Sequence, residues 1–283
     1  MSIFKTELNK SICNIGFIGA VLLTCILCFT SEAYVDGDTG KAFTVFEAMT
    51  SIDRSIIESN YEFASIILFM KSIGGYISMF IPIIVAFPYM ITCCTEKTSG
   101  NYRILIHRSK IIKYNGIKFL TAMFTGGLAF MLGIILYGIV VSVVFPALSF
   151  YNIDNETTNM ILPSPEIYTA IKIIAAAFLY GAVSAIPAVF LSSFCYNPYI
   201  ITCTPFMLTY IWNTGINKIA NHAMQTNNIE LIKTIQPFYP YSITYFIFTT
   251  ANYEKTLLFN IMYSVFFFIG FMVIIKNKTD KGA

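Results

Sequence analysis

Long apolar stretches alternate with shorter polar ones along the whole chain. A helix of about 20 predominantly apolar residues crosses the hydrocarbon core of a bilayer, and most of the stretches reach that length. They predict six membrane-spanning helices in one transmembrane domain, residues 1–283, so we expect an all-α polytopic membrane protein. The six predicted spans are residues 13–31, 73–95, 110–145, 168–192, 199–214 and 256–275.

Three segments outside the spans have patterns of their own. Residues 2–12 place apolar side chains at helical spacing among lysines, which predicts a short helix on the membrane interface; an ordinary polar tail explains the pattern equally well. Apolar residues three or four apart predict an amphipathic helix over residues 43–57. Residues 215–255 are mixed, and their apolar run, 243–248, is too short to cross. This segment predicts an outer re-entrant or interfacial hairpin between the fifth and sixth spans.

The composition favours a surface covered by lipid. Hydrophobic residues make up 56% of the chain and charged residues 12%, whereas a soluble domain has about 25% charged residues. So few charges cannot cover a globule with polar side chains, but a surface in contact with a bilayer needs none. We therefore expect the lipid bilayer among the partners of this chain, and no nucleic acid.

The basic residues decide the orientation. Residues 96–118 hold six Lys and Arg residues and one acid, Glu96, between two apolar spans. The positive-inside rule places such a segment in the cytosol. With both termini on the same side, most basic residues face the cytosol and most acids face outward. We expect a multi-pass protein of the cytoplasmic membrane with cytosolic N- and C-termini.

Patterns of catalytic or metal-binding residues are missing from the sequence. His107 and His222 have no partner motif, and no predicted span contains an Asp, so the ligand and catalytic sets of intramembrane proteases do not occur. Cys25 and Cys28 have CxxC spacing, but inside an apolar helix, where small buried side chains are the simpler interpretation. No GxxxxGK(S/T) phosphate-binding loop occurs either. We expect no enzyme activity, no metal and no cofactor in this chain.

A signature between the second and third spans resembles one found in a family of transporters. Its members are Glu96, Gly100, Leu105, Arg108 and Lys113 or Lys118. Together with the layout of spans and the Pro237–Pro240 stretch, it resembles the permease subunits of ABC type-2 exporters. His107 departs from the pattern, since the family often has Pro before the basic residue. The resemblance implies a cytosolic coupling helix over about residues 98–108.

In this family the coupling helix docks into a groove on a separate ATP-binding subunit. Apolar side chains would supply contact and charged ones would fix the register, and ATP and Mg²⁺ would belong to that subunit. Taken alone, the basic segment favours a topology anchor that contacts anionic lipids; its length and pattern ahead of the third span favour docking. The residues implied for coupling are Glu96, Gly100, Arg103, Ile104, Leu105 and Arg108.

By the same resemblance, a second permease copy or a sister permease completes a pathway between the second and fifth spans of the two chains. An apolar, aromatic lining suits an amphipathic peptide, a lipid or a hydrophobic drug, so we expect ATP-driven export of such a substrate. Ordinary helix packing explains any one of the candidate lining residues equally well. These candidates are Tyr76, Met79, Phe80, Phe206, Tyr210 and Asn213.

Two other classes of function stay open. An ion-coupled carrier or channel usually places acids in the middle of the membrane; the six spans contain almost none, and Lys172 lies near the end of one. A stand-alone immunity or sensor protein without an ATPase also fits the sequence, but it leaves the basic segment without a partner.

Overall fold

The computed structural model describes residues 3–280 except 38–39, 75, 101–108, 110, 152, 163, 227, 236–237 and 239–252. Nearly all of the described secondary structure is helical, which confirms the expected all-α class. Four segments are long and apolar enough to cross a membrane, and a bent pair of helices makes a fifth if it counts as one span. The four are Ile77–Thr98, Ile111–Phe150, Thr157–Leu191 and Glu254–Asn277.

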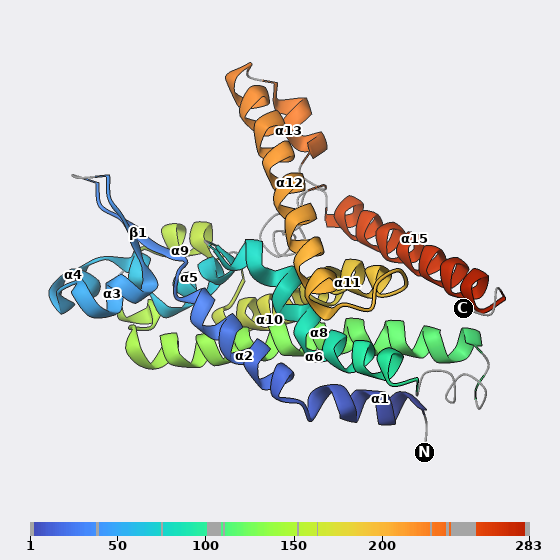
Figure 1. The fold of residues 1–283 in the computed structure, drawn as a ribbon. Coiled ribbons are helices and arrows are strands. Elements are labelled where there is room, and N and C mark those ends of the chain that lie inside the picture. The colour runs from blue at the N-terminus through green and yellow to red at the C-terminus, as the bar shows by residue number, and fades with distance from the viewer. Residues whose placement is uncertain are drawn as a thin grey trace.

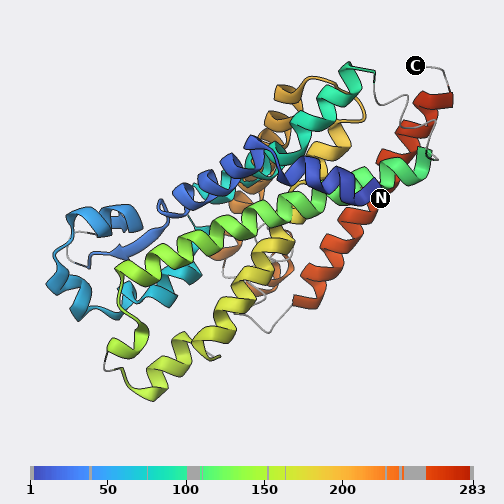
Figure 2. The ribbon, with the colours of Figure 1, turned by 90° about the horizontal axis from the view of Figure 1, so that it is seen from below.

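The longest helix, α8 (Ile111–Val144), runs through the middle of the molecule (Figures 1 and 2). Three other helices pack along it: α2 (Ile15–Cys28), α6 (Ile77–Thr98) and α10 (Glu166–Ser184). α8 is apolar on all sides, as expected of a helix that other helices or lipid surround. The predicted third span, 110–145, agrees with it to one residue at each end.

Gly133 allows α2 to lie directly against α8. A Cβ atom at this position would lie 2.4 Å from Cβ of Thr24 and 2.9 Å from the carbonyl oxygen of Val21. Real Cβ atoms do not approach other atoms so closely, so this crossing depends on glycine. Small residues serve the same purpose in many membrane proteins, where close backbone approach drives helix packing.

The first two helices meet at a sharp bend. α1 (Ile3–Ile12) and α2 are inclined by 57° to each other. The side chain of Asn14 accepts a hydrogen bond from the backbone N–H of Gly16 over 3.2 Å and so caps the start of α2. The structure confirms the helix predicted over residues 2–12. α2 is shorter at both ends than the first predicted span, 13–31.

One end of the molecule holds short elements that connect the long helices (left in Figure 1). We call it the hairpin end after its two paired strands. The prediction of one amphipathic helix over residues 43–57 is wrong, because Ile52 and Asp53 are extended and divide the segment into two helices. The elements are β1 (Glu32–Val35), β2 (Ala42–Thr44), α3 (Val45–Ser51), α4 (Arg54–Ser59), η1 (Tyr61–Phe63), α5 (Ser65–Met70), η2 (Lys71–Ile73), η3 (Leu148–Phe150) and α9 (Asn155–Ile161). β1 and β2 pair antiparallel.

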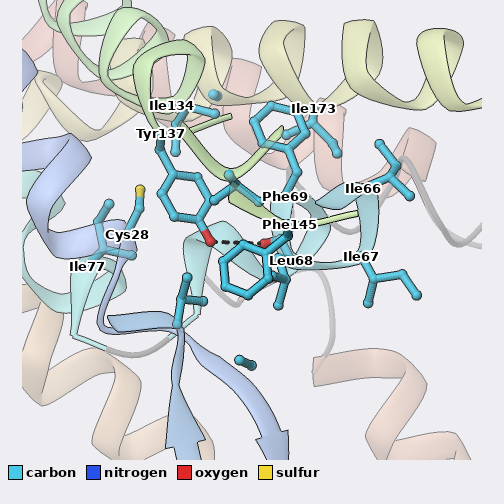
Figure 3. Close-up of a cluster of buried hydrophobic side chains, with 14 of the residues drawn as sticks. Cys28, Ile66, Ile67, Leu68, Phe69, Ile77, Ile134, Tyr137, Phe145 and Ile173 are labelled. Atoms are coloured by element: carbon cyan, nitrogen blue, oxygen red, sulfur yellow. Dashed lines mark hydrogen bonds between the residues drawn. The ribbon is translucent and has the colours of Figure 1, made fainter. Parts of the chain in front are cut away.

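A buried cluster joins the hairpin end to the long helices (Figure 3). Leu68 of α5 lies inside it beside Ile134 and Tyr137 of α8. The hydroxyl of Tyr137 donates to the carbonyl oxygen of Leu68 over 3.3 Å, so this buried polar group is satisfied (Figure 3). The connection before α6 is therefore part of the hydrophobic core.

The predicted fourth span, 168–192, is divided into two helices. α10 ends at Ser184, and α11 (Ile186–Leu191) follows directly. Pro187 lies in the first turn of α11, where its missing N–H costs no helical hydrogen bond. The division between the two helices thus lies next to this proline.

α12 (Pro198–Gln225) contains the predicted fifth span, 199–214, but continues past it and leaves the bundle (Figure 1). Its second half is polar, and it is not among the segments apolar enough to cross a membrane. α13 (Ile229–Ile235) packs against it. Residues 215–225 of the predicted hairpin are therefore helical, and its apolar run, 243–248, lies outside the described residues.

The last helix, α15 (Tyr253–Asp280), contains the predicted sixth span and packs loosely. Only 11% of its most apolar stretch is buried. Aromatic pairs attach it: Phe268 lies on Phe119 of α8 with ring centroids 5.1 Å apart, and Phe267 on Phe190 of α11 at 5.0 Å. The start of α1 and the end of α15 lie at the same end of the molecule, which we call the termini end (Figures 1 and 2).

Candidate functional site

Side chains from three helices meet at the termini end, and we call this group the Glu96 cluster. Its members are Glu7 and Lys10 of α1, Glu96 of α6, and Tyr114 and Lys118 of α8. Glu96 is at the centre. Its Oε1 accepts a hydrogen bond from Nζ of Lys10 over 2.9 Å, and its Oε2 accepts from Nζ of Lys118 and from the Tyr114 hydroxyl, the latter over 3.3 Å.

The Glu96 cluster balances its charges within the chain. The ammonium groups of Lys10 and Lys118 face two carboxylates. One belongs to Glu96, and the other to Glu7, whose carboxylate lies 3.3 Å from Nζ of Lys10. The side chain of Lys118 is 3% exposed and that of Glu96 is 13% exposed, so water and salt screen this pair very little. Burying a charge is costly unless it is paired and hydrogen-bonded. Because each partner needs the others, the cluster fixes the positions of α1, α6 and α8 relative to one another.

Helical spacing explains how the chain builds this cluster. Glu7 and Lys10 are three residues apart on α1, and Tyr114 and Lys118 are four apart on α8, so each pair lies on one helix face. Nζ of Lys118 also lies 4.9 Å from the centroid of the Tyr114 ring, within the range of a cation–π contact. From the sequence, Lys118 belonged to the basic cytosolic segment and to the family signature; its pairing with Glu96, 22 residues away, was not expected.

Lys97, the next residue of α6, contacts a different neighbour. Its Nζ donates to the carbonyl oxygen of Ser192, just after α11, and lies 5.9 Å from the ring centroid of Tyr196. Successive side chains of an α-helix point about 100° apart. The end of α6 is therefore held by α1 and α8 through Glu96, and by the segment after α11 through Lys97.

The predicted coupling segment begins where α6 ends. Gly100 has a φ of 75°, a left-handed conformation that glycine adopts without strain and that commonly ends a helix. Glu96, which we expected to pair with a partner protein, is engaged by Lys10 and Lys118 of its own chain. The other residues predicted for coupling lie outside the described residues: Arg103, Ile104, Leu105 and Arg108.

The structure brings together two of the residues predicted to line a pathway. Phe80 of α6 stacks on Phe206 of α12 with ring centroids 5.3 Å apart. Asn213 has a buried side-chain oxygen without a hydrogen-bond partner in the described part of the chain. The remaining three candidates are exposed: Tyr76 directly before α6, Met79 on α6 and Tyr210 on α12.

A cavity of about 400 Å³ lies between α10, α11, α12 and α15, beside Pro82 of α6. None of the candidate site residues named from the sequence lines it. Aromatic and aliphatic side chains form most of its wall, among them Tyr180, Phe190, Trp212 and Tyr263. The signal in the sequence was a proline in each of three helices, Pro82, Pro187 and Pro205, since all three line the cavity.

Within the described ranges, no group of three or more His, Cys, Asp and Glu side chains could hold a metal ion. The seven cysteines are free thiols, and Cys28, Cys93 and Cys94 are buried. Burial in apolar surroundings makes a thiol less reactive, because it disfavours the thiolate.

The fold and these two sites define a helical protein with several helices of membrane-spanning length, an internally paired charged cluster at one end, and an aromatic cavity among its later helices. Comparisons with protein-family models, with curated proteins and with solved structures find no match for the chain.

Proposed function

We propose that this chain is the permease subunit of an ATP-driven exporter in the cytoplasmic membrane. Its cargo would be amphipathic or hydrophobic: a peptide, a lipid or a drug. The observation that carries the proposal is the position of the Glu96 cluster, which joins α1, α6 and α8 directly before the proposed coupling helix, 98–108. A partner that displaces this segment moves three helices together, because the buried ion pairs connect them.

The energy comes from a separate ATP-binding-cassette subunit. The sequence has no phosphate-binding loop, so ATP and Mg²⁺ belong to that partner. Gly100 ends α6 and turns the chain toward the partner, and Ile104 and Leu105 supply apolar contact. Arg103 and Arg108 pair with acidic groups of the partner. Glu96 transmits the movement within the chain, since its carboxylate is already occupied by lysines.

A second permease copy, identical or a sister chain, completes the transport pathway. α6 and α12 pack side by side, and the Phe80–Phe206 stack lies at their contact. Tyr76 and Tyr210, exposed beside this stack in the single chain, would face the second copy across the pathway. In this arrangement residues 199–214, the first part of α12, form the fifth of six spans, and both termini lie in the cytosol.

Crosslinking and ATP hydrolysis test the proposal. We expect a photoreactive amino acid at residue 105, in protein expressed in its native membranes, to crosslink to an ATP-binding-cassette ATPase that mass spectrometry identifies. In nanodiscs, the purified complex should hydrolyse ATP at a rate that the cargo stimulates. Leu105→Asp and Arg108→Glu should abolish the stimulation while the protein still inserts. Lys41→Glu, an exposed change at the hairpin end, serves as the matched control.

Two results would overturn the proposal. Full transport activity of the purified chain without any nucleotide-hydrolysing partner would favour an ion-coupled carrier or channel. Unchanged stimulation in both Leu105→Asp and Arg108→Glu would show that residues 98–108 are a topology anchor only.

A further inference from the structure

The cavity beside α12 has the size and wall of a ligand site. Small-molecule sites in proteins are commonly about 300–1,000 Å³ and mostly apolar, with few polar groups, and this cavity holds about 400 Å³. Its lining includes no charged side chain among the described residues. A charged headgroup would therefore find no counter-ion inside it.

Two polar side chains of the wall direct their hydrogen bonds into their own helices. The hydroxyl of Thr209 donates to the carbonyl oxygen of Pro205 over 2.8 Å, within α12. The side-chain amide of Asn260 donates to the carbonyl oxygen of Thr256 over 2.8 Å, within α15. These donors already have partners in their own helices, so the wall offers an incoming ligand mainly hydrocarbon and aromatic surface.

The mouth of the cavity opens on an apolar surface. Leu208, Trp212 and Phe238 line the cavity and are also exposed, at 55%, 50% and 39%. Nε1 of Trp212 donates to the carbonyl oxygen of Phe238 over 2.9 Å, which fixes the indole ring at the mouth. Met207 and Ile211, on the same helix, continue the exposed apolar surface around it. Such an exposed apolar surface suits contact with the hydrocarbon chains of a bilayer.

We propose that this cavity binds one hydrocarbon chain of an amphiphile, which enters from the bilayer past Trp212 and leaves its polar headgroup outside. The hydrocarbon chain fills the space that the three prolines line between the helices, and it packs α15 against α10 and α12. The proposal does not depend on the proposed ATP-driven mechanism. The hydrocarbon chain could belong to a membrane phospholipid or to a free fatty acid, and the test separates these two sources.

Trp212 provides a built-in reporter, because it is the only tryptophan of the chain. The protein is reconstituted in nanodiscs of dioleoylphosphatidylcholine, and tryptophan fluorescence is followed while a brominated chain is added, since bromine quenches indole on contact. One series uses dibromostearoyl phosphatidylcholine and the other uses dibromostearate. We expect the wild-type protein to be quenched more than variants with a filled cavity, at equal mole fraction of probe, in at least one series, and the series with this excess identifies the source.

Variants distinguish the cavity from ordinary lipid contact. Thr209→Phe fills it from α12, and Ser184→Phe fills it from α10. Each should abolish the excess and leave only the quenching that comes from the surrounding lipid. Thr214→Phe is the matched control, because Thr214 is exposed on α12 and does not line the cavity. Circular dichroism and gel filtration check that each variant folds, and having two filling variants keeps the test valid if one of them does not.

Native mass spectrometry gives an independent readout. The wild-type protein and Thr214→Phe should retain one lipid or fatty-acid mass that Thr209→Phe lacks. Quenching that rises in proportion to probe, and equally in all variants, would show contact with surrounding lipid alone and overturn the proposal.

Discussion

Lys118 and Glu96, on different helices, form an ion pair that is almost wholly removed from water. Removing one partner of a buried pair leaves an uncompensated charge, which typically costs about 3–5 kcal/mol. We therefore expect Lys118→Met to lower the stability by about that amount, because Lys10 alone, at 44% exposure, cannot replace the lost ammonium group. The midpoint of thermal unfolding in detergent measures the loss.

Two further variants isolate the charge effect. Lys113→Met removes an exposed lysine from the same helix and should change the midpoint little. The double variant Glu96→Leu with Lys118→Met removes both charges and leaves Glu7 paired with Lys10. It should recover most of the loss, since apolar replacement of a whole buried pair is often neutral. A double variant as unstable as Lys118→Met would show that the altered side-chain shape at residue 118, and not an unpaired charge, causes the loss of stability.

Gly133 is expected to be the most sensitive glycine at the contact of α2 with α8. Gly133→Ala would place a methyl group against Thr24 and force the helices apart, at a cost of about 1–3 kcal/mol. Gly19→Ala, on α2, is the control, because nothing lies within 4 Å of the added atom. Thermal unfolding of both variants in nanodiscs measures the difference; equal effects would contradict the close contact.

The start of α3 should loosen at low pH. The Thr44 backbone N–H, and then its hydroxyl, hydrogen-bond the carboxylate of Glu47 and hold the pKa of Glu47 below its ordinary value. A lowered pKa in the folded state means that the stabilisation is present above the ordinary carboxyl pKa and is lost as the pH falls through the lowered one. The protection factors of the Val45–Ser51 amides, meaning the exchange rates relative to the intrinsic rate at each pH, should therefore fall in acid. Glu47→Gln should exchange faster at neutral pH and lose this dependence.

Cysteine labelling tests the orientation of α12. In a background without the native cysteines, Thr226→Cys at the exposed end of α12 should react with a membrane-impermeant maleimide added outside intact cells. Lys113→Cys, at the start of α8, should react only after the membrane is opened. The reverse pattern would invert the proposed topology.

Hydropathy located the long helices because a bilayer imposes a length on apolar segments. For this reason α8 matches a predicted span to one residue at each end, and α15 contains another. Within α12 the same criterion stopped at residue 214, although the helix continues to Gln225. A helical signal was present there, since Ile216, Ala220 and Ala223 recur at helical spacing and are buried.

Other features depend on contacts that no local pattern contains. The extended backbone at Ile52 divides α3 from α4, and Ile52 packs partly buried against the core cluster of the hairpin end. Glu96 finds Lys10 at a separation of 86 residues, so its burial could not be read from the basic segment alone. The cavity forms only where four helices pack around it, so no single segment of the sequence indicates it. Tertiary contacts decide each of these features.

The loose packing of α15 leaves most of its apolar surface uncovered by the rest of the protein. A few aromatic rings hold it to the other helices, so in a bilayer we expect acyl-chain length and detergent choice to influence its tilt. Preparations that strip lipid should release this helix before any other part of the molecule.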